Sequence, residues 1–99
     1  MVIIAQISYP PESAKDMAKR FLEAPKFPDY MSRKGPYINS NMDKGIITLS
    51  LFELEKAKTG EGLEALGNYY ATFFGVSGFK YKIETFFDVN EALKMIGMG

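Results

Sequence analysis

The sequence carries one pattern of expected secondary structure twice, in the order strand, helix, strand. The first copy runs from Val2 to about Met42 and the second from about Ile46 to Phe87. Two such units in a chain of 99 residues have few ways to share one hydrophobic core. The repeated pattern therefore constrains the fold tightly, whereas it constrains the function much less.

Hydrophobic periodicity and turn residues define the individual elements. Apolar residues alternate or run together in the expected strands, recur every three or four positions in the expected helices, and are separated by prolines and glycines. A capping-box pattern from Asp88 to Glu91 opens a last short helix. We expect strands at residues 2–9, 37–42, 46–54 and 79–87, helices at 11–24, at 60–74 and from 88 onward, and an irregular loop at 25–36.

The order βαββαβ followed by a C-terminal helix is typical of a ferredoxin-like α+β sandwich. In that fold two helices cover one face of a four-stranded antiparallel sheet. Right-handed crossovers place the first and third strands in the centre of the sheet. We therefore expect a single ferredoxin-like domain over residues 1–99.

The first expected strand is apolar on both faces at its start, which is typical of a central strand. Side chains alternate along each strand, and on this basis we assign residues to the two faces of the sheet. We expect the helices to cover Ile3, Ala5, Ile7, Ile38, Met42, Ile47, Leu49, Leu51, Tyr81 and Ile83. The opposite face would carry Val2, Ile4, Gln6, Ser8, Tyr37, Asn39, Asn41, Ile46, Thr48, Ser50, Phe52, Leu54, Lys80, Lys82, Glu84 and Phe86. That second face is too apolar for open water and too polar for a dry core. We expect two copies to pack these faces together as a homodimer and to enclose a cavity.

In element order and facing, the chain resembles the dimeric α/β-barrel superfamily from Val2 to about Phe87. The resemblance implies a face-to-face homodimer and a range of activities that includes cofactor-free monooxygenases, haem-degrading enzymes and isomerases. The haem-degrading branch is disfavoured, because its usual axial histidine has no counterpart in this chain. The cofactor-free monooxygenases often use Trp, His, Tyr, Asn or Arg in the cavity, and this chain offers only Tyr, Asn and Arg.

Composition removes several kinds of chemistry. The chain has no histidine and no cysteine, which excludes a nucleophilic triad based on either residue, an ordinary zinc site and a histidine-ligated haem. Any general acid or base must be Asp, Glu, Lys or Tyr with a shifted pKa. Twelve basic and twelve acidic residues cancel, so we expect neither nucleic acid nor membrane as a partner. We also expect no metal, no cofactor and a cytoplasmic location, since no signal peptide or spanning segment is recognisable.

The candidate site residues lie on the face that the helices leave open and in the long loop. Lys82 and Glu84 share that face and could transfer protons if enclosed, or form a solvated pair if not. Arg33, followed by Lys34 and Gly35, could bind a carboxylate or phosphate, or form a solvated turn. We name Lys82, Glu84, Tyr37 and Asn39 as candidate catalytic residues. The candidate ligand-binding residues are Gln6, Ser8, Tyr30, Arg33, Tyr37, Asn39, Ser50, Lys82 and Glu84.

A second motif is Gly60-Glu-Gly62-Leu-Glu-Ala65, which formally matches a dinucleotide-binding pattern. That pattern requires a strand directly before the first glycine, whereas residues 55–59 intervene here, and the two glutamates would repel a pyrophosphate. We interpret it as the start of a helix.

Three functions remain open from the sequence. The first is a homodimer that binds a small organic or aromatic molecule between its sheets. The second is a cofactor-independent monooxygenase or isomerase, and the third is a metabolite-sensing regulatory domain.

Overall fold

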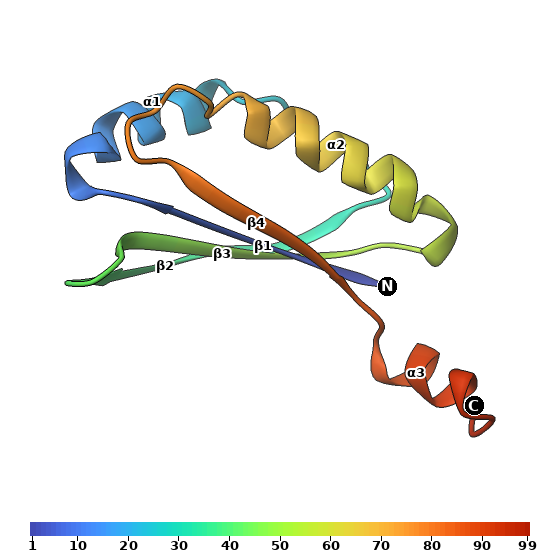
Figure 1. Cartoon of the computed structure of the whole chain (residues 1–99). Helices are drawn as coiled ribbons and strands as arrows, with labels where there is room; N and C mark the ends of the chain where they lie inside the picture. Colours follow the sequence, from blue (N-terminus) through green and yellow to red (C-terminus); the bar gives the residue numbers. More distant parts are fainter.

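The computed structural model describes all 99 residues and contains one four-stranded antiparallel sheet with two helices on one face (Figure 1). The elements are β1 (Val2–Tyr9), a 3-10 turn (Pro11–Ser13), α1 (Ala14–Glu23), β2 (Ser32–Asn41), β3 (Gly45–Glu53), a second 3-10 turn (Lys56–Lys58), α2 (Thr59–Ala71), β4 (Lys80–Phe86) and α3 (Val89–Met95). The strand order is β2-β3-β1-β4. The prediction of a mixed α+β fold with β1 and β3 in the centre is therefore confirmed.

β1 is one of the two central strands and pairs with both β3 and β4. Its side chains alternate between buried and half-buried positions, with Ile3, Ala5 and Ile7 facing the helices. It pairs with β3 through Ile3 and Phe52, and with β4 through Ala5 and Ile83. These registers decide which side chains of the neighbouring strands share the covered face, because side chains alternate strictly along a strand.

β2 begins five residues earlier than predicted and includes a bulge. The sequence predicts a strand from Tyr37 and an irregular loop before it, yet the ladder with β3 starts at Ser32. The register shifts between Lys34 and Tyr37, where Gly35 has a φ of 95°. A glycine with positive φ lets a strand bulge and then continue. Residues 32–34 are therefore part of the sheet, and the loop is correspondingly shorter.

The predicted facing of β3 is wrong by one residue. Phe52 lies opposite Ile3 and is fully buried under the helices, and Ser50 lies opposite Ala5 and is also buried. Ile47, Leu49 and Leu51 therefore occupy the uncovered face instead of the core. The predicted facing of β1 and β4 is confirmed, and so is that of Tyr37, Ile38 and Asn39 in β2. Met42, which was expected under the helices, lies in the hairpin turn and is fully exposed.

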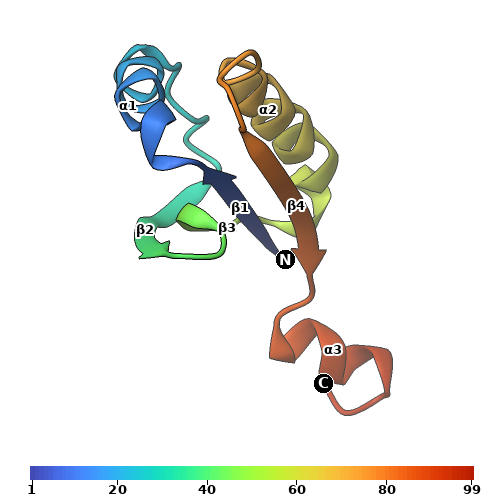
Figure 2. The ribbon, with the colours of Figure 1, turned by 60° about the vertical axis from the view of Figure 1, so that its left-hand side comes forward.

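The core lies between the sheet and the two helices, both of which are on the same side of it (Figures 1 and 2). An aromatic cluster dominates its centre: Tyr69 packs edge-on against Tyr70 and Phe73, with ring centroids 5.0 and 5.5 Å apart. Offset and edge-to-face pairs of this kind stabilise a core beyond the area that they bury. The buried apolar residues are Ile3, Ala5, Ile7, Met17, Met31, Phe52, Leu54, Leu66, Tyr69, Tyr70, Phe73 and Val76.

α3 lies beyond the end of the sheet, on the side away from α1 and α2 (Figures 1 and 2). The predicted capping box is confirmed: the Glu91 amide donates to Asp88 Oδ1 at 2.8 Å, and the Asp88 amide donates to Glu91 Oε1 at 3.0 Å. The amino group of Met1 forms ion pairs with both carboxylates. None of the helices has the length and apolar character needed to cross a bilayer.

Candidate ligand-binding site

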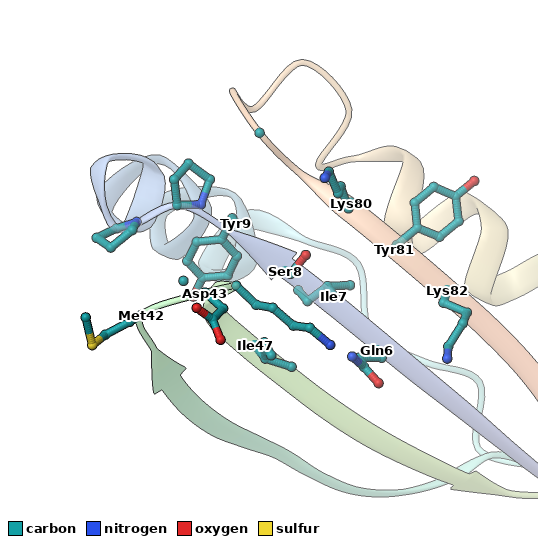
Figure 3. Close-up of a pocket in the computed structure, with 15 residues that line it drawn as sticks. Gln6, Ile7, Ser8, Tyr9, Met42, Asp43, Ile47, Lys80, Tyr81 and Lys82 are labelled. Atoms are coloured by element: carbon teal, nitrogen blue, oxygen red, sulfur yellow. The ribbon is translucent and has the colours of Figure 1, made fainter.

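A hollow of about 710 Å³ lies on the uncovered face of the sheet (Figure 3). Figure 3 shows Gln6 of β1 and Lys82 of β4 projecting to the same side, in agreement with their pairing across the two strands. Ser8 and Lys80 form the next pair along these strands. The hairpin of residues 42–45 closes one end. The hollow is therefore an open basin with a polar floor, which the hairpin borders at one end.

Lys82 and Glu84 lie beside this basin and bind each other. Lys82 Nζ is 3.1 Å from Glu84 Oε1, and the two side chains are 62% and 48% exposed. An exposed pair of this kind is screened by water and contributes little to stability. In a single chain the two groups are therefore a solvated ion pair, and covering this face would be needed to change their chemistry.

Tyr37 and Asn39 occupy the same uncovered face, but on the opposite edge of the sheet. Both belong to β2, and β3 and β1 separate them from β4. Three strand spacings of about 4.8 Å place β2 roughly 14 Å from β4. One chain therefore does not bring the four candidate catalytic residues together.

Arg33 and Ser50 lie on the other face, under the helices. Arg33 Nη2 donates to Ser50 Oγ at 3.0 Å, and Phe52, which pairs with Arg33, fixes this facing. Lys34 points to the uncovered face, where its Nζ is 3.1 Å from Glu53 Oε1. The basic pair predicted in a loop is thus divided between the two faces of β2. Arg33 and Ser50 form a site separate from Gln6, Ser8 and Lys82.

Two tyrosines near these sites have raised pKa values. Burial raises the pKa of Tyr70 to about 12, against the opposing effects of Arg33 and of the Ser50 hydroxyl. Burial also raises the pKa of Tyr9, which packs against the core at the end of β1 and borders the basin. Both phenols are therefore neutral near pH 7 and available as hydrogen-bond donors.

Tyr30 lies in neither site. It is half-buried in the connection between α1 and β2, and Lys58 Nζ lies 5.4 Å from the centre of its ring. The glycines of the formal dinucleotide motif, Gly60 and Gly62, lie within the first turns of α2, as interpreted from the sequence. Gly62 packs tightly on Leu54, because an added Cβ would lie 2.6 Å from Leu54 Cδ1.

Sequence reasoning missed several residues that line the basin. Lys80 follows from alternation, since it shares a face with Lys82 two positions later. The turn residues Met42, Asp43 and Lys44 reach the basin only because the hairpin folds beside the end of β1. No pattern local to the hairpin contains that information.

Comparison with protein-family models found no matching family. Comparisons with curated proteins and with solved structures found no significant similarity. The resemblance to the dimeric α/β-barrel superfamily therefore stays a prediction that rests on element order and facing.

Proposed function

We propose that this protein is a ferredoxin-like homodimer of the dimeric α/β-barrel type, which binds a small organic or aromatic molecule between its sheets. The observation that carries the proposal is the uncovered face of the sheet. Its centre holds aliphatic side chains from both central strands, and aromatic side chains flank them on the edge strands. These residues are Val2, Ile4, Tyr37, Ile47, Leu49, Leu51 and Phe86.

The accessible surface area of the chain is larger than expected for a monomer, which supports the proposal that a partner covers part of it. The accessible surface is 6636 Å², whereas a folded monomer of this mass is expected to expose about 5,700 Å². The excess of roughly 1,000 Å² is close to the ~800 Å² that each partner buries in a standard interface. The radius of gyration, 15.1 Å, also exceeds the ~13 Å of a compact chain of this length, and α3, which extends beyond the sheet, contributes to this excess (Figure 1). A second copy is the natural partner, because an isologous interface needs no other protein.

The polar basin lies at one end of this apolar face, so the sheet of a second copy would cover the basin and enclose it. Gln6, Ser8, Lys80 and Lys82 would then point into an enclosed space, where hydrogen bonds and charges orient a ligand more strongly than in water. We place binding ahead of catalysis because the four candidate catalytic residues are split between opposite edges of the sheet. A sensor of such a ligand would use the same pocket.

The dimer is tested by analytical ultracentrifugation of the wild type and of two matched variants. The mass obtained for the wild type should be twice the 11.1 kDa of a single chain. Leu51→Glu places a charge on the uncovered face and should yield a folded monomer. Leu22→Glu changes a side chain on α1 that is 82% exposed and should remain dimeric. A monomeric wild type at high micromolar concentration, or two variants that behave alike, would refute the pairing.

The ligand site is tested by NMR titration of ¹⁵N-labelled dimer with a set of small aromatic compounds. Shift changes should gather at the amides of Gln6, Ser8 and Lys82, and they should disappear in the Leu51→Glu monomer. Changes that persist unaltered in the monomer would show that the binding site is not between the sheets.

A further inference from the structure

A second hollow, of about 280 Å³, lies on the opposite side of the sheet, between α1 and strands β2 and β1. Its walls are almost entirely apolar and include Met17 and Phe21 of α1, Ile38 of β2 and Phe73, just beyond α2. Phe21 and Ile38 are 44% and 69% exposed, so the hollow opens to solvent. Its volume is near the lower end of ordinary small-molecule sites.

Arg33 is the one charged side chain among the residues that line this hollow. Its guanidinium carbon lies 5.1 Å from the ring centre of Phe27 and 5.5 Å from that of Phe52. Nη2 donates to Ser50, but Nε is buried and has no hydrogen-bond partner. Arg33 forms no ion pair with any carboxylate of the chain.

A cation in such surroundings is costly unless something compensates it. The aromatic faces and one serine hydroxyl supply part of that compensation. The guanidinium always carries its charge, and one of its N–H groups is buried without a partner. Part of the free-energy cost of burying this group is therefore not compensated within the chain. Every other buried side-chain nitrogen and oxygen of the chain has a hydrogen-bond partner, so Arg33 Nε is the single exception. An anion that binds at the Nη atoms would compensate the charge of the guanidinium as a whole.

The chemistry of the hollow selects the kind of anion. A guanidinium binds a planar carboxylate through two parallel hydrogen bonds. The apolar walls favour a hydrophobic body and disfavour a second charge, which would lack a partner there. Tyr70 also lines the hollow and stays a neutral donor at pH 7.

We propose that the hollow between α1 and the sheet binds a small apolar or aromatic monocarboxylate, whose carboxylate pairs with the guanidinium of Arg33. The site is formed within one chain and lies on the covered face. It therefore does not depend on the pairing of sheets, and binding should persist in the Leu51→Glu monomer.

The test is a calorimetric and NMR titration of the wild type with benzoate, phenylacetate and hexanoate. Benzamide, which has the same ring without the charge, is the matched neutral ligand, and acetate is the matched acid without an apolar body. At least one of the three acids should bind at least tenfold more tightly than benzamide and than acetate. The shift changes should centre on Arg33, Phe21 and Ile38.

Two variants then test whether the charge of Arg33 is the one that binds the carboxylate. Arg33→Met keeps the length and the apolar packing of the side chain and should weaken binding of that acid at least tenfold. Lys34→Met removes the neighbouring cation, which points to the other face, and should change the affinity less than twofold. Circular dichroism establishes that both variants are folded. If Arg33→Met does not fold, the comparison of charged and neutral ligands on the wild type still decides the question.

The proposal is overturned if none of the three acids binds at least tenfold more tightly than benzamide and acetate, or if folded Arg33→Met binds the tightest of them as the wild type does. It is also overturned if none of the three acids binds at about 10 mM, where a site with a millimolar Kd would be largely filled.

Discussion

Phe52 and Leu51 are adjacent residues of β3 that point to opposite faces of the sheet, and truncating each in turn tests this facing. Phe52 is fully buried, and its ring packs edge-on against Phe27 with centroids 4.8 Å apart. Leu51 is half-buried on the uncovered face. Because the two residues share one strand and one backbone environment, Phe52→Ala and Leu51→Ala differ mainly in what their side chains contact.

The structure implies a large difference between the two variants. Removing a buried phenylalanine costs about 3–5 kcal/mol, since the cavity adds to the lost transfer free energy. For a domain of this size each kcal/mol lowers Tm by about 4–8 °C, so the expected fall is roughly 12–40 °C. A half-exposed leucine in a separate chain should cost about 1 kcal/mol. Phe52→Ala should therefore be the far more damaging change in dilute solution.

The assay is thermal unfolding followed by circular dichroism at two protein concentrations about twentyfold apart. The loss caused by Phe52→Ala should be independent of concentration, because it arises inside one chain. The loss caused by Leu51→Ala should grow with concentration, because a dimer is stabilised by mass action and Leu51→Ala weakens it. The assignment of faces is refuted if Leu51→Ala is the more destabilising variant in the dilute sample.

Two further predictions test the packing around α2. The pKa of Tyr70 rises from its ordinary value of 10.0 to about 12, so the folded chain keeps a proton that the unfolded chain loses. This contribution to stability is complete below pH 10 and is lost as pH rises through about 12, at roughly 1.4 kcal/mol per pH unit. Urea unfolding at pH 8 and pH 11 should show this extra loss in the wild type and not in Tyr70→Phe; equal losses would contradict it. Gly60→Ala has open space around its Cβ and should stabilise α2 by about 0.5–1 kcal/mol. Gly62→Ala drives its Cβ against Leu54 and should be at least about 1 kcal/mol less stable than Gly60→Ala. Chemical denaturation measures both, and the reverse order would show that the contact at Gly62 is not tight.

The elements that the sequence predicts well are those with a local cause. The capping box at Asp88 is a pattern of four residues, and the hairpin turn at Gly45 follows from the need for positive φ, which is 73° there. The strand order follows from the handedness of crossovers, which holds for almost any sequence. None of these features depends on a specific contact between residues that are far apart in the sequence.

The facing of β3, in contrast, depends on contacts with a strand that is far away in the sequence. Residues 46–54 are apolar at both parities, so alternation alone selects no face. The register with β1, which sets Phe52 against Ile3, decides the matter. A shift of one residue exchanges every side chain between the two faces. The early start of β2 has a similar origin, because only the ladder with β3 shows that the strand continues across the bulge at Gly35.

That single shift has two linked consequences for function. It moves Ser50 from the expected intersheet cavity to the covered face, where its hydroxyl accepts a hydrogen bond from Arg33. In exchange it places three aliphatic side chains of β3 on the uncovered face. The uncovered face is therefore more apolar at its centre than the sequence suggests, which favours pairing of sheets. On the covered face Ser50 supports a guanidinium that has no carboxylate partner. The register that favours the proposed pairing of sheets therefore also helps to hold the one charged group of the second hollow.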